Sequence, residues 1–278
     1  MRVLVTGGAG FIGQAVQAVL EERGHEFLSL DHPFNVCSRA DVFGAAQGCQ
    51  AIINLAGVLG TAETVGAEHR AAEVNILGAL TVADVARELG IPMVQIGTGH
   101  KGQPNPYAIT KACAEDLLLA RAQWCGQEIN VVRAFHAYGP GQKVCPPHGS
   151  AKVRKIVPSF VCRALTGMPL EVNGSGRQLI DLIHVDEVAR VLVDALDGPV
   201  WGQVIEAGTG LATSVLSAAE AVIDVCGSTS EIKLVPMRDG EPPATRVVAE
   251  RPASDRLWPY KLDETVGYYE RTLLGKVA

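Results

Sequence analysis

The sequence predicts an α/β protein in which a doubly wound parallel sheet carries a smaller α/β C-terminal domain. Short runs rich in Val and Ile alternate with longer segments whose apolar residues recur at helical spacing. Such runs are typical of parallel strands that helices bury on both faces. After about Gly139 the rhythm changes to the Pro/Gly-rich stretch GPGQKVCPPHG, which predicts a domain boundary.

The alternation gives the elements in order. Strands are expected at 2–6, 25–30, 51–57, 92–97 and 129–135, and helices at 11–24, 67–90 and 107–126. Two later segments, 179–185 and 203–208, have the composition of strands that rejoin the main sheet. We therefore expect residues 1–140, rejoined by roughly 177–208, to form the first domain. Residues 141–176 and 209–278 are expected to form the second.

Composition excludes several classes of protein. With 47% hydrophobic and 19% charged residues, the chain is predicted to be compact and globular. A net charge of −6 gives no support for a nucleic-acid-binding surface. No stretch approaches the ~18 apolar residues of a membrane span, and no secretory signal is recognisable, so a cytoplasmic protein is expected. The seven cysteines are odd in number and include no Cys-x-x-Cys pair, which argues against a disulfide framework or a metal cluster.

A glycine-rich turn, TGGAGFIG, lies between the first predicted strand and helix, with Gly7, Gly10 and Gly13 at three-residue spacing. Glycine allows the tight turn and the approach of a pyrophosphate, and the helix N-terminus offers free N–H groups to it. Asp31 ends the second strand, where a carboxylate accepts both adenosine ribose hydroxyls and repels a 2′-phosphate, so NAD is favoured over NADP. The alternatives are a turn without a ligand and an Asp31 that only caps a turn.

Nine segments extend this pattern along nearly the whole chain. They are TGGAGFIG, Asp31, NLAG at 54–57, VNILG at 74–78, YAITK at 107–111, VVRAFHAYGPGQ at 131–142, IDLIHVDEVA at 180–189, EAGTG at 206–210 and RDGEP at 238–242. In this combination the chain resembles the extended short-chain dehydrogenases/reductases, specifically the NAD-dependent nucleotide-sugar epimerases and dehydratases. The resemblance implies a Rossmann-type NAD-binding domain and a substrate domain for a nucleotide-diphosphate sugar, but one fold serves many reactions.

The resemblance makes Tyr107 the general acid/base, Lys111 the residue that lowers its pKa and holds the nicotinamide ribose, and Thr98 the hydroxyl that contacts the reacting oxygen. Tyr107 and Lys111 lie one helical turn apart, on one helix face, although a chance surface pair has the same spacing. Only nine residues separate Thr98 from Tyr107, where the family usually has some two dozen. His100, beside Thr98, is either a second proton relay or a loop histidine without a role.

The two residues after Thr98 narrow the choice of reaction. The family's 4,6-dehydratases carry an Asp-Glu pair there, whereas this chain has Gly99-His100. Without those carboxylates water elimination lacks its acid and base. We therefore predict C4 epimerisation of an NDP-hexose or NDP-hexuronic acid through a transient 4-keto sugar. An NDP-keto-sugar reductase or dehydrogenase and a non-catalytic NAD-sensing protein are the alternatives.

The resemblance also supplies the remaining candidate residues. Arg238 is expected to hold the pyrophosphate and Glu241 the nucleoside ribose, while His136, Ile180 and Lys155 stand where many members have Asn, Arg and Asn. The helices at 66–89 and 107–126 form the dimer contact in many relatives, so a homodimer is expected. The cofactor residues are predicted to be Gly7, Gly10, Phe11, Ile12, Gly13, Asp31, Asn35, Val36, Leu55, Ala56, Gly57, Asn75, Tyr107, Lys111 and Phe135, and the substrate residues Gly60, Thr61, Thr98, His136, Gln142, Lys155, Gln178, Arg238 and Glu241.

Overall fold

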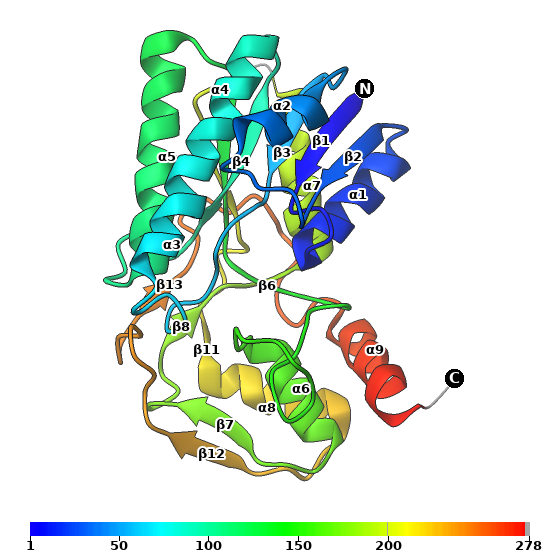
Figure 1. The fold of residues 1–278 in the computed structure, drawn as a ribbon. Helices are drawn as coiled ribbons and strands as arrows, with labels where there is room; N and C mark the ends of the chain where they lie inside the picture. Colours follow the sequence, from blue (N-terminus) through cyan, green and yellow to red (C-terminus); the bar gives the residue numbers. More distant parts are fainter. Residues whose placement is uncertain (199, 276–278) are drawn as a thin grey trace.

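A computed structural model describes residues 1–198 and 200–275. Its centre is a parallel sheet in the order β10-β5-β4-β3-β1-β2 (Figure 1). The strands are β1 (Arg2–Thr6), β2 (Glu26–Leu30), β3 (Ala51–Asn54), β4 (Met93–Thr98), β5 (Ile129–Ala134) and β10 (Val204–Ala207). The predicted doubly wound α/β fold is confirmed.

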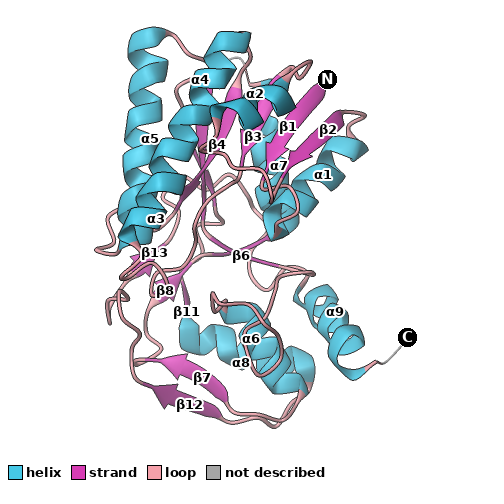
Figure 2. Cartoon of the chain, viewed as in Figure 1, coloured by secondary structure: helices cyan, strands magenta, loops and turns pink. Residues whose placement is uncertain are grey.

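Two hydrophobic cores cover the two faces of this sheet. Side chains of a strand alternate between its faces; Val3 and Val5 pack with α1 (Phe11–Glu22) and α7 (Val185–Asp197), whereas Leu4 packs on the other face. That other face is covered by α2 (Arg39–Ala46), α4 (Ala79–Leu89) and α5 (Pro106–Cys125) (Figure 2). The carboxyl ends of the strands are thereby left as the place where loops gather.

The long helix expected at 67–90 consists of three consecutive segments. They are α3 (Glu68–Ala72), the π-helical η1 (Glu73–Gly78) and α4, which ends at the left-handed Gly90. The π segment contains Asn75, whose buried side chain bonds to neighbouring elements and not to solvent. Helix α5 begins at Pro106, with the Asn105 side chain accepting from Ala108 N, and ends at the left-handed Gly126.

A third core lies outside the main sheet, in the lower part of Figure 1. It is formed by α6 (Ile156–Leu165), α8 (Val215–Cys226) and α9 (Leu262–Leu274), with β7 (Leu170–Asn173) paired to β12 (Ile232–Val235). Most of these segments come from the region predicted as the second domain. The exact domain boundaries stay a prediction.

One strand prediction was wrong. Residues 204–207 do join the main sheet, but 179–185 does not: β8 (Leu179–Ile180) pairs with β11 (Thr213–Ser214) and β13 (Arg246–Val247), and β9 (Leu182–His184) pairs with β6 (His136–Tyr138). The interruption is Asp181, whose fully buried carboxylate accepts from Thr209 N, Gly210 N and Ala249 N at 2.8–3.1 Å. A buried carboxylate must be hydrogen-bonded, so the chain bends there and Asp181 ties it to the segments that follow β10 and β13.

Across residues 1–198 and 200–275, no helix is both long and apolar enough to cross a membrane. All seven cysteines are free thiols. No group of three or more His, Cys, Asp or Glu side chains in the described part of the chain is arranged to hold a metal ion.

Candidate active site

The glycine turn between β1 and α1 is closely packed. Gly7 has φ +71°, and a Cβ at Gly13 would meet Gly7 O and lie 2.5 Å from Gly8 O. Gly10 is the N-cap of α1; it makes no side-chain cap, and no acidic residue occupies the first turn. The helix therefore presents free N–H groups and its positive dipole end to an anion. These glycines fit the pyrophosphate of a dinucleotide.

Asp31 lies directly against this turn. Its carboxylate accepts from Ala9 N at 3.0 and 3.1 Å and from the Ser29 hydroxyl, and the side chain is half-exposed. An acceptor held at the end of β2 suits ribose hydroxyls. Asn35 is exposed, with its side-chain oxygen accepting from Cys37 N at 3.0 Å, whereas Val36 is buried against η1.

The opposite wall of the cofactor region begins where β3 ends. Leu55–Gly57 follow as a loop, with Leu55 N and Ala56 N bonded to Thr6. Asn75 accepts from Val58 N at 2.8 Å and donates to Thr110 Oγ1 at 3.0 Å, so the π segment fixes this loop to α5. A Cβ at Gly57 would lie 3.9 Å from Lys111 Nζ, which places the predicted Gly57 and Lys111 together. Phe135 is buried against Gly99.

Lys111 is buried, and its Nζ donates to Ile96 O at 2.6 Å. Burial lowers the pKa of this amine to about 8, and Glu115 acts in the opposite direction. Glu115 itself is bound by Lys101 Nζ at 2.8 Å and Arg133 Nη2 at 2.6 Å. The hydrogen bond to Ile96 O holds the amine in place. Its lowered pKa brings it closer to neutral pH than an exposed lysine.

Tyr107 is half-buried, and burial raises the pKa of its phenol. A side-chain hydrogen bond with Thr98 acts in the opposite direction. Thr98 is the last residue of β4 and is buried, so the short loop after it does not remove it from Tyr107. Both side chains lie beside His100, so their hydroxyls can act on one substrate oxygen.

The short loop 99–105 turns toward α5. Lys101 in this loop pairs with Glu115 and Asp116 of that helix. His100 stays beside Thr98, with its Nδ1 3.2 Å from Thr98 Oγ1. Its ring centroid is 4.8 Å from that of His136 and 6.2 Å from that of Tyr107. His100, which the sequence left as either a proton relay or a loop histidine without a role, therefore lies next to Thr98 and Tyr107.

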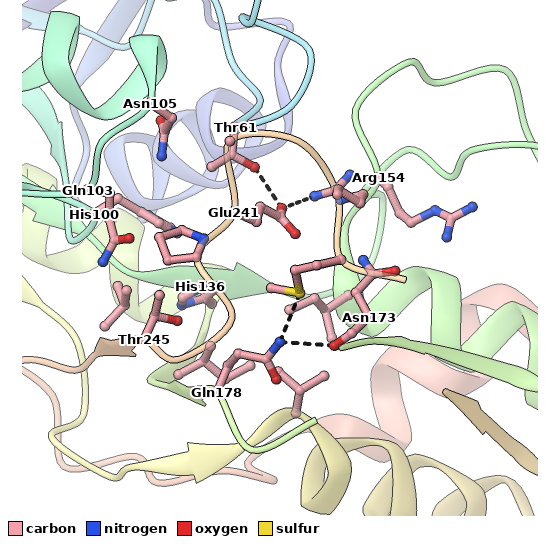
Figure 3. Close-up of a pocket in the computed structure, with 18 of the residues that line it drawn as sticks. Thr61, His100, Gln103, Asn105, His136, Arg154, Asn173, Gln178, Glu241 and Thr245 are labelled. Atoms are coloured by element: carbon pink, nitrogen blue, oxygen red, sulfur yellow. Dashed lines mark hydrogen bonds and ion pairs between the residues drawn. The ribbon is translucent and has the colours of Figure 1, made fainter. Parts of the chain in front are cut away.

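A cleft extends from these histidines to the third core, the one outside the main sheet (Figure 3). It holds about 810 Å³ of space, part of it open to solvent. Glu241 accepts from Thr61 Oγ1 at 2.7 Å and from Arg238, and Arg238 Nη1 lies 3.4 Å from Glu63 Oε1. Arg238 Nε and Glu63 Oε2 are buried without hydrogen-bond partners. Buried polar atoms of this kind are the groups that a bound ligand can satisfy.

The other predicted substrate residues differ in position. Gln178 lines the cleft; its amide donates to Asn173 O at 2.9 Å, and its Oε1 has no partner. Lys155, which precedes α6, lies within electrostatic reach of both cleft histidines. Gln142 bonds instead to Ala137 O, away from the cleft lining, and Gly60 lies against Glu63.

Several cleft residues carry no motif and were not predicted. They include Gln103, Asn105, Arg154, Asn173 and Thr245, which Figure 3 labels, and Met237, while Glu63 lies behind the lining, paired with Arg238. Asn105 had a usable signal, because Asn before Pro is a common helix start. Glu63 is the single acidic residue between Asn54 and Glu68, an isolated charge in an otherwise apolar loop. The others come from segments that only the fold brings together.

The fold, the glycine turn and the Tyr107–Lys111–Thr98 group together define an NAD-dependent enzyme of the short-chain dehydrogenase/reductase type. Residues 3–208 match the family model described as NAD dependent epimerase/dehydratase family. The chain belongs to this family, whose members modify nucleotide sugars with NAD as cofactor.

Individual relatives differ in reaction. A UDP-N-acetyl-alpha-D-glucosaminuronate decarboxylase of Bacillus cytotoxicus is 26% identical, over 84% of this chain and 83% of its own. A dTDP-glucose 4,6-dehydratase of an Actinoplanes species is 28% identical, over 86% and 87%. The structure of UDP-glucose 4-epimerase from Thermotoga maritima with UDP-glucose is similar at a TM-score of 0.87 and 25% identity, covering 98% of this chain and 100% of that one.

Proposed function

We propose that the protein is a nucleotide-sugar 4-epimerase that acts on an NDP-hexose or NDP-hexuronic acid through a transient 4-keto sugar. The observation that carries the proposal is the grouping of Thr98 and Tyr107 around His100, which lines the cleft, in a chain whose two residues after Thr98 are Gly99 and His100 and not carboxylates. A 4-epimerase requires an acid/base and a means of holding the reacting oxygen, and these two side chains supply both.

In this proposal Tyr107 removes the proton from the C4 hydroxyl, while Thr98 donates a hydrogen bond to the same oxygen. The turn formed by Gly7, Gly10 and Gly13 would hold the pyrophosphate of NAD, and the cofactor would supply the hydride acceptor and donor that reaction at C4 requires. Lys111 lies one turn from Tyr107 and stabilises its phenolate electrostatically when protonated. The keto sugar then rotates in the cleft and presents its other face. Tyr107 returns the proton to the C4 oxygen, and the product has the inverted configuration at C4.

The carboxylates near the site speak against a dehydratase. Glu115 accepts from Lys101 and Arg133, and Glu241 accepts from Thr61 and Arg238. Neither is placed beside Thr98 to remove a proton next to the ketone. A dehydratase would need an acid and a base at the two positions after Thr98, and this chain has Gly99 and His100 there.

Substrate binding is proposed for the part of the cleft that Gln178, Arg238 and Glu241 line. Arg238 would hold the diphosphate, because a guanidinium fork matches phosphate oxygens, and Glu241 would accept from the nucleoside ribose. Gln178, with its free Oε1, faces the same space. Ligand binding would exchange the present pairing of Arg238 with Glu63 and Glu241 for contacts with the phosphates.

The test is incubation of the protein and NAD with UDP-, GDP- and dTDP-linked hexoses and hexuronic acids, with products identified by NMR and NADH followed by absorbance. A C4 isomer without lasting NADH is the expected result. A 4-keto-6-deoxy product would identify a dehydratase and contradict the proposal. Turnover only of keto sugars added together with NADH would identify the reductase, and NAD binding without turnover of any sugar would identify an NAD-sensing protein.

We also propose a homodimer built on η1, α4 and α5, which lie along one side of the molecule (Figure 1). Leu77, Ile109, Leu117 and Trp124 expose 41–78% of their surface there. Ile109, Leu117 and Trp124 recur at helical spacing on α5, which favours packing against a second copy. Light scattering should give a dimer for the wild type and a monomer for Leu117→Glu/Trp124→Glu. An unchanged mass in both would contradict this contact.

A further inference from the structure

Two histidines lie against each other in the cleft (Figure 3). His100 follows β4 and His136 begins β6, so the fold brings together residues 36 positions apart in the sequence. Their ring centroids are 4.8 Å apart, and His100 Nδ1 is 3.2 Å from Thr98 Oγ1. Both rings line the cleft, so both are available to a ligand that occupies it.

One polar atom of this pair lacks a partner. His136 Nδ1 is buried without a hydrogen-bond partner. Within residues 1–198 and 200–275, the one histidine that pairs with an acid is His184, bound to Asp186 away from the cleft. Glu241 is the carboxylate that acts on His100, and it already accepts from Thr61 and Arg238.

One cation lies within electrostatic range of both rings. Lys155 acts electrostatically on His100 and on His136, and it opposes the protonation of each. Burial acts in the same direction and lowers the pKa of His100 to about 4. Glu63 and Arg238 are the charged groups that act on Lys155 in turn. The cluster therefore has potential donors and positive charge, without an anion of its own that contacts the histidines.

The position of the cluster relates it to the sugar and not to the diphosphate, which has Arg238. If Thr98 contacts the C4 oxygen, His100 lies one hydrogen bond further and meets a substituent on a carbon next to C4. At C5 that substituent is a neutral hydroxymethyl group in a hexose and a carboxylate in a hexuronic acid. A carboxylate accepts from imidazole N–H groups and is attracted by Lys155. A hydroxymethyl group carries no charge, so it neither balances the charge of Lys155 nor forms a charge-assisted hydrogen bond with the imidazoles.

We propose that His100, His136 and Lys155 form the site for the C6 carboxylate of an NDP-hexuronic acid, so that this acidic sugar is the preferred substrate class. The proposal rests on the proposed reaction at C4 for the placement of the sugar. His100, His136 and Lys155 determine specificity here, and no covalent step is assigned to them.

Binding tests the proposal independently of turnover. The NAD-loaded protein is titrated with UDP-glucuronic acid and UDP-glucose, and with the GDP- and dTDP-linked pairs, in two buffers of different ionisation enthalpy near pH 6.5. We expect tighter binding of the acid by about 10- to 100-fold, from one or two charge-assisted hydrogen bonds. We also expect proton uptake with the acid alone, because its carboxylate raises the pKa of the two imidazoles. Equal affinity for acid and hexose in every pair, or no binding of any acid, overturns the proposal.

Variants separate the histidine site from a general loss of structure. His136→Asn and Lys155→Asn place the residues common in the family at these positions, and His69→Ala on the exposed surface of α3 is the matched control. We expect each cleft variant to lower kcat/KM for the hexuronic acid by about 10- to 100-fold more than it lowers kcat/KM for the hexose. Equal losses for both sugars indicate a structural role and overturn the proposal.

Product identity distinguishes this proposal from the proposed function. Selective use of the acid with release of CO₂ and a pentose product would support the carboxylate site and contradict C4 epimerisation. Epimerisation of hexoses without preference for the acid would support the proposed function and contradict the carboxylate site. A C4 epimer of the hexuronic acid as the main product would support both.

Discussion

The cofactor half and the substrate half of the site are built differently. The cofactor half is made largely of backbone: Gly7, Gly10 and Gly13 shape a turn in which a single added carbon would meet carbonyl oxygens. The substrate half is made of side chains such as Thr61, His136 and Arg238, which come from separate segments. Backbone leaves no room for variation, whereas side chains can be exchanged one at a time. Change of substrate without change of cofactor is therefore the expected mode of divergence on this fold.

The largest effect should come where the two halves meet. Tyr107→Phe removes the acid/base but keeps the ring, so we expect kcat to fall by about 10³-fold with NAD and nucleotide-sugar affinity nearly unchanged. Rapid-mixing kinetics and calorimetry measure the two quantities. A fall of less than about tenfold would mean that another group transfers the proton, with Thr98 and His100 next to be replaced.

The cofactor half should be intolerant of a methyl group. In Gly13→Ala the new Cβ would lie 2.5 Å from Gly8 O, so the turn must move and NAD affinity should fall by about 100-fold. Gly44→Ala in α2 is the control: nothing lies within 4 Å of its Cβ, and alanine is favourable within a helix. Fluorescence titration of both variants with NAD checks the difference. Similar affinities would show that the turn does not hold the cofactor.

The substrate half should make stability depend on pH. The folded pKa of His100 is about 4, below the ordinary 6.5, and that of His136 is also lowered. As pH falls from 6.5 toward 4 the unfolded chain takes up protons that the folded chain does not, so the free energy of unfolding decreases, on the order of 2 kcal/mol. Urea unfolding of His100→Asn/His136→Asn should show a smaller decrease over this range than the wild type. His69→Asn serves as control, and parallel curves for all three proteins would contradict the buried, neutral pair.

The smallest of these effects should come from a conservative change in the substrate half. Arg238→Lys keeps the charge but loses the planar fork that contacts Glu63 and Glu241. We expect KM for the nucleotide sugar to rise about tenfold with kcat within twofold, measured by steady-state kinetics. A fall in kcat without a change in KM would place Arg238 in the chemistry and not in diphosphate binding.

Local sequence was sufficient for the features that neighbouring residues determine. The five N-terminal strands, the glycine turn and the start and end of α5 follow from apolar runs, from glycine at positive φ and from Asn105-Pro106. The pairing of 179–185 was predicted wrongly. The apolar pattern there is that of a strand, but the partners of the Asp181 carboxylate lie 28 and 68 residues away and no local signal identifies them.

The sequence by itself determined the parallel strands and the glycine turn and singled out Tyr107 and Lys111 as candidates, because each depends on spacing within one segment or on a known order of motifs. Only the tertiary structure decided that Thr98 and Tyr107 both lie beside His100 despite the short loop, that Glu63 faces Arg238, and that His100 lies against His136. The physical reason is that burial and charge act through space. An ionisable side chain acquires its pKa and its partners from residues distant in the sequence, and these set what the site can bind.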